Sequence, residues 1–261
     1  MEELERLREG AAALGVELGA PEAERLLRVL DEVLEANRRV NLTAVRERAA
    51  ALEKHLLDSV AAWRVWRPRG DERVVDVGTG GGLPGLALKA VAPGLRLVLL
   101  DAARRKIDAC RDIVQRLGWD GVAAVHGRAE EWARGDGRES QDAAVVRAVG
   151  ALDVVAELTL PCVRPGGVVL AWKGRLDGEE LEAGRRAARV LGGEIATVDR
   201  FALPWSGAAR AVVLIEKARP TPPRYPRRPG IPERRPLGGG RGKERRDADG
   251  SDRLADTDSG G

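Results

Sequence analysis

Apolar residues follow a helical spacing at the start of the chain. Leu26, Leu30 and Val33 recur at intervals that place them on one face of a helix. Residues 2–37 therefore predict helices, with a break near Gly15–Pro21. Because an apolar helix face needs a partner, we expect residues 1–65 to form an N-terminal helical extension packed on a main domain.

The pattern changes at Arg73, where short runs rich in valine and leucine begin to alternate with helical segments. This alternation favours an α/β fold, a mostly parallel seven-stranded sheet with helices on both faces. No helical pattern separates the last two strands, so the end of the sheet is expected to be antiparallel. The predicted strands are 73–77, 96–100, 122–125, 143–146, 167–172, 195–201 and 211–216. The predicted helices among them are 84–91, 103–117, 151–161 and 178–190.

The chain changes character after Ala218. Seven prolines between positions 220 and 236 exclude a regular helix or a central strand there. We therefore divide the chain into a main domain at 66–218, a basic Pro-rich segment at 219–237 and a tail at 238–261. The tail consists mainly of glycine and charged residues and is predicted to be disordered.

Charge is unevenly distributed along the chain. The net charge is +3, yet the part from Lys217 onward holds 12 Lys and Arg against 7 Asp and Glu. The remainder holds 32 against 34. Such local basic density indicates a polyanionic partner, with a solubilising tail as the alternative.

Composition also bounds the class of protein. Hydrophobic residues make up 43% of the chain, enough for a large core, but no stretch of 18 apolar residues predicts a membrane span. The acidic N-terminus does not resemble a secretory signal. The two cysteines, Cys110 and Cys162, have no metal-ligand neighbours and are predicted to be buried thiols. We expect a cytoplasmic protein, monomeric and without a metal.

The stretch Arg73–Gly85 predicts a strand, a tight glycine loop and a helix start. Glycines such as Gly78 and Gly80 let the backbone turn sharply and approach a ligand. Asp101 ends the next predicted strand, where an acid can accept hydrogen bonds from ribose hydroxyls. Leu83 stands where the dinucleotide fingerprint requires glycine, so the loop looks like that of class I methyltransferases, which bind S-adenosylmethionine (SAM). A purely structural turn is the alternative.

Further polar residues follow the next three predicted strands. They are Ala129–Glu130 after the third strand, Arg147 after the fourth and Lys173 after the fifth. Ligands of such sheets bind beyond the carboxyl ends of the strands, so these residues are expected to meet the glycine loop. The alternative interpretation is that each of these positions, taken alone, is ordinary surface charge.

Two more groups lie in the N-terminal extension. His55 and Asp58 are three residues apart in a helical run, which favours a structural pair over a catalytic one. Arg38, Arg39 and Arg46 flank a predicted connection around Asn41 and are either surface charge or contacts to a polyanion.

Several segments together resemble one family, the bacterial small-subunit ribosomal RNA guanine-N7 methyltransferases (RsmG, also called glucose-inhibited division protein B). The resemblance spans about residues 20–237. It rests on these segments: Asn41–Arg46, His55–Ser59, Asp76–Gly85, Arg128–Glu131, Arg147–Ala148, Lys173–Gly174 and Arg224–Leu237. The chain departs from the family at Ala102–Ala103, where members usually carry Ser-Leu, so any side-chain contact from that serine to a ligand is lost.

The resemblance implies a class I methyltransferase (Rossmann-like) fold, SAM as methyl donor and N7 of a guanine in 16S ribosomal RNA, free or in the small ribosomal subunit or its precursor, as acceptor. Gly78 and Leu83 would contact SAM through the loop. Ala129 and Glu130 would bind adenine through a backbone N–H and a carboxylate. Arg147 would lie near the methionine carboxylate or the target base.

This chemistry makes few demands on side chains. Guanine N7 has a free lone pair, so it attacks a methyl group without losing a proton, and the site's task is alignment. The Pro161–Cys162 pair lies in an apolar helical run and indicates core packing rather than the nucleophile of a cytosine methyltransferase. The target nucleotide must be single-stranded or flipped. Trp205 and Tyr225 are candidates for stacking on a base, with packing as the more ordinary use.

The basic segment suggests an RNA contact of its own. The expected phosphate contacts are Arg38, Arg39, Arg46, Lys173, Arg224, Arg227, Arg228, Arg234 and Arg235. In that case removing residues after Ala218 would leave SAM affinity nearly unchanged. The alternative is that the segment packs back onto the domain.

Three rival functions remain open from sequence. A methyltransferase for small molecules would have no use for the basic segment, and a non-enzymatic rRNA-binding assembly factor would not need an intact glycine loop. A dehydrogenase that uses NAD is disfavoured by Leu83.

Overall fold

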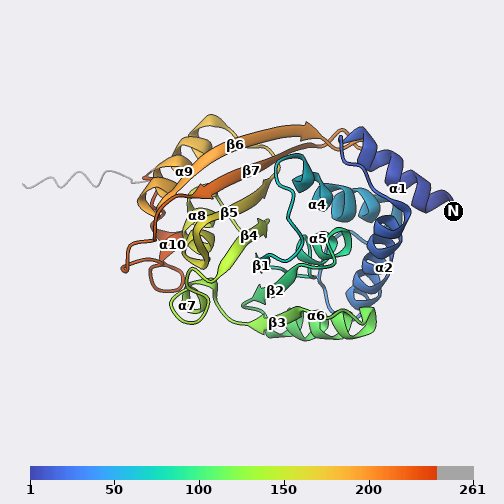
Figure 1. The fold of residues 1–261 in the computed structure, drawn as a ribbon, viewed down its shortest axis with the longest axis horizontal. Helices are drawn as coiled ribbons and strands as arrows, with labels where there is room; N and C mark the ends of the chain where they lie inside the picture. Colours follow the sequence, from blue (N-terminus) through green and yellow to red (C-terminus); the bar gives the residue numbers. More distant parts are fainter. Residues whose placement is uncertain (240–261) are drawn as a thin grey trace, which may run out of the picture.

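A computed structural model describes residues 1–239 and shows a seven-stranded sheet between two layers of helices (Figure 1). The strand order is β3-β2-β1-β4-β5-β7-β6. The strands are β1 (Arg73–Val77), β2 (Arg96–Asp101), β3 (Val122–His126), β4 (Gln141–Arg147), β5 (Val163–Lys173), β6 (Gly193–Ala202) and β7 (Ala209–Lys217). All seven predicted strands are present, and the predicted α/β fold with a seven-stranded sheet and helices on both faces is confirmed.

The first five strands are parallel, and β7 pairs antiparallel with both β5 and β6. This confirms the antiparallel end expected from the missing helical spacer. The chain order reverses at β1, which lies between β2 and β4. Parallel strands open a crevice at such a switch point, beyond their carboxyl ends. The glycine loop after β1 lies there.

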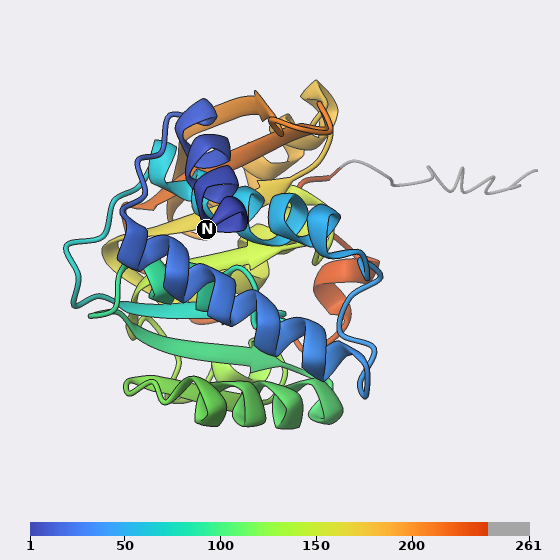
Figure 2. The same cartoon turned by 90° about the vertical axis from the view of Figure 1, so that its right-hand side faces the viewer.

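The N-terminal extension covers one face of the sheet. Its helices are α1 (Glu2–Ala13), α2 (Ala20–Asn37), α3 (Arg48–Ala51) and α4 (Asp58–Val60), with a π-helical turn at Leu52–Leu57. Figure 2 shows α2 lying beside α6 (Arg104–Leu117), and α2 also packs on α5 (Gly85–Val91). Leu26, Leu30 and Val33 are buried there, as their spacing predicts.

The opposite face is covered by α8 (Leu152–Thr159) and α9 (Gly178–Val190). Alternate residues of the strands point to the two layers: Val74 and Val145 join the core under the extension, whereas Val75 and Val146 join the core under α8. Both cysteines are buried, as predicted, and burial raises the pKa of each thiol to about 12.

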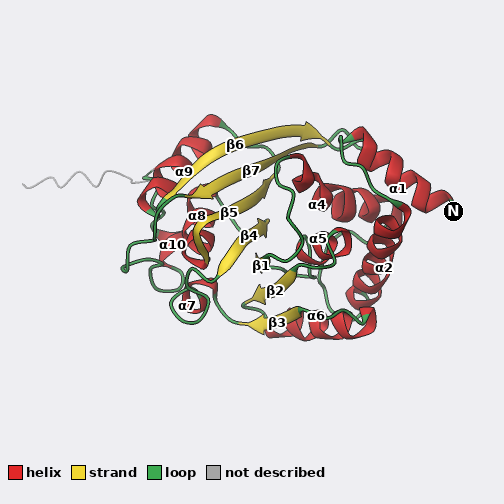
Figure 3. Ribbon diagram, viewed as in Figure 1, coloured by secondary structure: helices red, strands yellow, loops and turns green. Residues whose placement is uncertain are grey.

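The Pro-rich segment returns along this second layer and contains the short helix α10 (Ile231–Arg234), which packs on α8 (Figure 3). Arg227 donates from its backbone N–H and its guanidinium to Glu157, whose side chain is fully buried. The guanidinium is therefore already bonded, and in this arrangement Arg227 differs from the sequence expectation of a phosphate contact. Of the tail predicted to be disordered, residues 240–261 lie outside the described residues.

Within residues 1–239, no helix combines the length and the apolar character needed to cross a membrane.

The backbone at Gly85 is packed so closely against its neighbours that it leaves no room for a side chain. A Cβ added there would lie 2.8 Å from Asp76 Oδ2 and 3.0 Å from Leu99 Cδ2. We expect Gly85→Ala to lower the free energy of unfolding by about 1–3 kcal/mol, because both neighbours are tightly packed. Urea denaturation measures it. Gly178→Ala is the control, since its Cβ would meet nothing within 4 Å; equal stability of the two variants would contradict the prediction.

Candidate functional site

A cleft of about 600 Å³ lies where the glycine loop faces the N-terminal extension. Its walls come from the connection Leu42–Val45, the π-helical turn, the loop after β1 and the ends of β4 and β5. Segments far apart in sequence therefore meet at the switch point, which is where the sheet topology predicts a ligand.

The glycine loop is shaped by residues with left-handed backbone conformations. Gly78 and Gly80 have φ values of 69° and 58°. A Cβ at Gly78 would lie 2.6 Å from Val149, whereas a Cβ at Gly80 would meet no atom within 4 Å. The backbone of Gly80 thus faces open space, so a ligand can approach it closely. Leu83, the next predicted contact, is largely buried but lines the same cleft.

Asp76 holds the loop from beneath. Its Oδ2 accepts hydrogen bonds from the Thr79 hydroxyl and the Gly85 N–H, both at 2.8 Å. The side chain is fully buried, and burial raises the pKa of Asp76 to about 6 against the opposing effect of these donors. Sequence reasoning included this residue in the loop motif but assigned it no role.

Asp101 lies at the end of β2, next to the loop. Its Oδ2 accepts the Gly80 N–H at 2.9 Å, and its Oδ1 accepts the Ala103 N–H at 2.8 Å. The side chain is only partly buried. The carboxylate therefore fixes the loop and still has lone pairs available for hydroxyl groups.

Ala129 and Glu130 open the short helix α7 (Ala129–Trp132) after β3. The Glu130 carboxylate is 3% exposed and accepts the backbone N–H of Gly230 at 3.0 Å. The Pro-rich segment thus holds Oε1, a contact between residues one hundred positions apart that no local pattern reveals. The sequence expectation that this carboxylate binds an adenine amine then concerns its other oxygen, Oε2, and stays a prediction.

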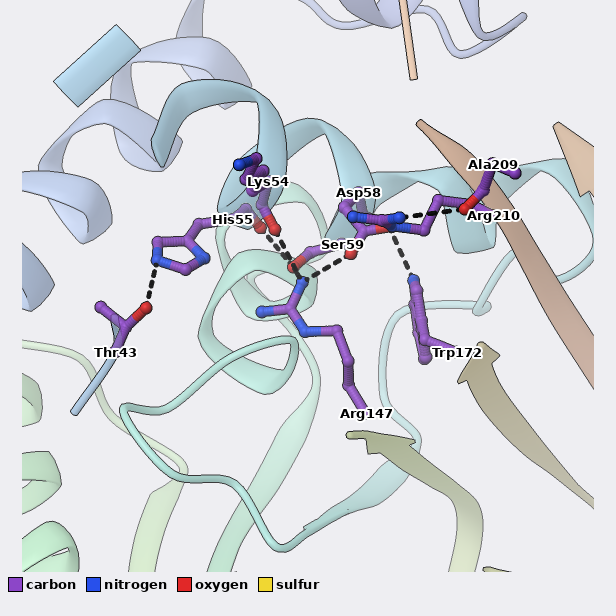
Figure 4. A network of polar contacts seen from close by, with 9 residues as sticks. All are labelled: Thr43, Lys54, His55, Asp58, Ser59, Arg147, Trp172, Ala209 and Arg210. Atoms are coloured by element: carbon purple, nitrogen blue, oxygen red, sulfur yellow. Dashed lines mark hydrogen bonds and ion pairs between the residues drawn. The ribbon is translucent and has the colours of Figure 1, made fainter. Parts of the chain in front are cut away.

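Arg147, at the end of β4, reaches across the cleft to the N-terminal extension (Figure 4). Its Nη1 donates to Asp58 Oδ2, Ser59 Oγ and the Lys54 carbonyl at 3.1–3.3 Å. Within residues 1–239, neither Nε nor Nη2 has an acceptor. One nitrogen is thus anchored, and the Nε/Nη2 edge remains available to a ligand.

Asp58 binds a second cation as well. The Nε of Arg210, at the start of β7, lies 3.3 Å from Asp58 Oδ1, and the Asp58 carbonyl accepts the Trp172 indole N–H at 2.7 Å. Burial raises the pKa of Asp58, and the two arginines oppose that rise. Sequence reasoning did not single out Arg210, because nothing in its neighbours marks it as part of the cleft.

His55 is not paired with Asp58, contrary to the expected structural pair. Its Nε2 lies 3.1 Å from the Thr43 hydroxyl, and burial together with the charge of Arg147 lowers the pKa of His55 to about 4. The π-helical winding of Leu52–Leu57 explains the difference, because residues three apart no longer stack as they do in an α-helix.

Lys173 lines the cleft but is bonded within the chain. Its Nζ lies 2.6 Å from Glu180 and donates to the Gly150 carbonyl at 2.6 Å. Lys54 and Lys106, which sequence reasoning passed over, line the same cleft. With Arg147, Lys173 and Arg210 they make its wall strongly cationic.

The remaining predicted phosphate contacts fall into two places. Arg38, Arg39 and Arg46 are exposed beside the connection that lines the cleft, and Arg38 pairs with Glu35. Arg224, Arg228, Arg234 and Arg235 are exposed on the Pro-rich segment, and Arg224 lies over the Tyr225 ring. Trp205 packs under Arg6, and Tyr225 is buried, so the structure favours packing for both aromatic residues.

Within residues 1–239, no cluster of three His, Cys, Asp or Glu side chains has the arrangement of a metal site.

Comparisons with known structures agree on the fold. The model resembles TrmN from Thermus thermophilus with a TM-score of 0.52 and 18% identity, over 69% of this chain and 53% of that one. It also resembles a mutant of MtNAS in complex with S-adenosylmethionine, with a TM-score of 0.51 and 18% identity, over 77% and 78% of the two chains.

Sequence comparisons are more specific. The curated protein "Ribosomal RNA small subunit methyltransferase G" of Deinococcus radiodurans is 46% identical over 234 residues, covering 89% of this chain and 92% of the relative. Its counterpart in Alkaliphilus metalliredigens is 38% identical over 232 residues, covering 88% and 97%. The family model described as rRNA small subunit methyltransferase G matches residues 22–205. On the strength of this match and of the glycine-loop cleft, the chain belongs to the rRNA small subunit methyltransferase G family.

Proposed function

We propose that this protein transfers a methyl group from SAM to N7 of a guanine in small-subunit (16S) ribosomal RNA. The observation that carries the proposal is that one cleft joins the glycine loop to a cationic wall. Its acid, Asp58, is bound to two arginines, and its histidine has a lowered pKa and a hydroxyl partner. Such a lining suits a reaction that removes no proton before the methyl transfer.

The residues present fit SAM. Among the described residues 1–239, Gly80 faces open space, Asp101 stands beside it with free lone pairs, and the Nε/Nη2 edge of Arg147 has no acceptor. When bound, SAM supplies a methyl group activated by a sulfonium centre. We assign Gly78, Gly80 and Leu83 to backbone and packing contacts, Asp101 to the ribose hydroxyls, and Ala129–Glu130 to the adenine.

We assign the free edge of Arg147 to the methionine carboxylate. An Nε/Nη2 edge matches two acceptor atoms side by side, as in a carboxylate or in guanine O6 and N7. A hydrogen bond to guanine N7 would occupy the lone pair that must attack the methyl group. The carboxylate is therefore the partner compatible with catalysis, and Arg147 acts by fixing the methyl donor.

RNA would approach over the exposed arginines at the mouth of the cleft. Arg39 and Arg46 have no ion-pair partner within residues 1–239 and adjoin Leu42–Val45, which lines the cleft. We place the phosphate contacts chiefly there. Arg224, Arg228, Arg234 and Arg235 extend the basic surface along the Pro-rich segment, while Arg38 and Lys173 contribute charge that is shared with Glu35 and Glu180.

Mapping of N7-methylguanine tests the function. Small ribosomal subunits and naked 16S rRNA are incubated with the protein and SAM, and methylated guanines are located by reduction, aniline cleavage and primer extension. We expect a single strong stop that requires both the protein and SAM. Binding of SAM without any methylated RNA would instead indicate a small-molecule methyltransferase, and RNA binding without SAM binding would indicate an assembly factor.

A charge-reversal variant tests, in the same assay, whether the RNA binds at Arg46. Arg46→Glu should raise the KM for rRNA and leave cofactor affinity unchanged, since Arg46 is exposed. The matched control is Arg189→Glu, an exposed arginine of α9 on the other face of the sheet. Equal effects of the two reversals would remove Arg46 from the RNA surface.

The role of Arg147 is tested by Arg147→Lys. The lysine keeps a charge toward Asp58 but loses the two-nitrogen edge. We expect the affinity for S-adenosylhomocysteine, measured by calorimetry, to fall about tenfold to a hundredfold, as for lost hydrogen bonds to a charged group. Arg175→Lys, at an exposed arginine just after Lys173, is the control and should keep affinity within about twofold. Unchanged affinity of Arg147→Lys for S-adenosylhomocysteine would contradict the assignment of Arg147 to the methionine carboxylate.

The raised pKa of Asp58 predicts a pH dependence. As pH falls through this pKa, the carboxyl group takes up a proton and loses its attraction for Arg147 and Arg210, so cofactor binding should weaken toward acid pH. Protonation of His55 contributes to this pH dependence only near its pKa of about 4. Calorimetry with S-adenosylhomocysteine should show weaker binding and a flatter pH profile for Asp58→Asn. Parallel profiles for the two proteins would contradict the role of Asp58.

A further inference from the structure

The Pro-rich segment is bonded repeatedly to the stretch that follows β3. We call residues 221–235 the strap. Arg134 Nε donates to the Pro226 carbonyl at 2.8 Å, and Arg138 donates to the carbonyls of Tyr225 and Thr221 at 2.8 and 2.7 Å. Glu139 accepts the Thr221 N–H at 2.6 Å. The first part of the strap, residues 221–226, is therefore tied to residues 134–139.

The strap also reaches the start of α7. The Gly230 N–H donates to Glu130 Oε1 at 3.0 Å, and Glu130 is buried. A helix of four residues, Ala129–Trp132, has too few internal hydrogen bonds to hold its own position. Its placement depends on contacts from outside, and the Gly230 N–H supplies one to the side chain of its second residue, Glu130.

The strap itself is fixed by a buried ion pair. Arg227 donates to Glu157 from its backbone N–H at 2.9 Å, from Nε at 2.8 Å and from Nη2 at 2.5 Å. Glu157 lies on α8 and is fully buried, with 0% of its surface accessible to solvent. A buried carboxylate without its cation is strongly unfavourable, so this pair holds the strap only three residues before Gly230.

We propose that the strap is a positioning element of the cofactor site, which sets the adenine-binding turn Ala129–Glu130 through the Gly230–Glu130 hydrogen bond. The inference rests on the proposed function, because it takes these two residues as the adenine contact. Gly230 and Arg227 act through Glu130 and touch no reacting atom. Cofactor affinity, and the preference of the site for the adenine base of the cofactor, then depend on residues beyond the sheet. This is contrary to the sequence expectation that removal of this segment leaves SAM affinity nearly unchanged.

The test compares two non-reactive ligands by calorimetry on the full chain. S-adenosylhomocysteine carries the adenine amine, and S-inosylhomocysteine has a carbonyl in its place. In Arg227→Ala we expect S-adenosylhomocysteine to bind about five- to tenfold more weakly, with a smaller loss for the inosine ligand. The affinity ratio of the two ligands should therefore shrink. Arg134→Ala, at an exposed arginine, changes the ratio in the same direction and serves if Arg227→Ala does not fold.

Arg64→Ala is the matched control. Arg64 also forms a long-range ion pair, with Asp199 at 2.5 Å, but it lies away from the strap and the cleft. This variant should lose thermal stability and keep the wild-type ligand ratio.

An unchanged ratio in folded Arg227→Ala and Arg134→Ala would overturn the proposal, as would equal wild-type affinity for both ligands. Wild-type protein that binds neither ligand would instead refute the proposed function.

Discussion

The carboxylate of Asp58 is the interaction on which the cleft depends. It joins the N-terminal extension to Arg147 at the end of β4 and to Arg210 at the start of β7. Two cations that would otherwise repel each other are thereby held within one wall. Because Nη1 of Arg147 is anchored by three acceptors, its remaining edge has a defined direction. The N-terminal helices are thus part of the site and not merely a cover for the sheet.

A second constraint operates on the other side of the sheet. Glu157 is fully buried and needs its partner Arg227, so this ion pair fixes the Pro-rich segment on α8. Basic residues on one segment consequently serve different purposes. Arg227 holds the segment in place, whereas Arg224 and Arg228 remain exposed to a polyanion. Charge counting cannot separate these uses, because both appear as arginine in a Pro-rich stretch.

The chemistry explains why the site holds so few conventional catalytic groups. A ring nitrogen with a free lone pair needs alignment with the methyl donor and no proton acceptor. The two groups of the cleft that could act as bases are both engaged within the chain. The ring of His55 contacts the Thr43 hydroxyl, and burial and the charge of Arg147 lower its pKa, while Asp58 is bound to two arginines. What the chain provides is rigidity in the loop, through Asp76 and Asp101, and orientation, through Arg147.

The sequence by itself determined the sheet, its antiparallel end, the helical extension and the glycine loop, because these depend on local periodicity and on backbone conformations that glycine adopts easily. It also identified Arg147, since strand ends of a parallel sheet share one edge. Only the tertiary structure brought Arg210 to Asp58 and Gly230 to Glu130, and it separated His55 from Asp58 through a π-helical turn. These outcomes depend on contacts between distant segments and on burial, and no local pattern of residue types encodes either.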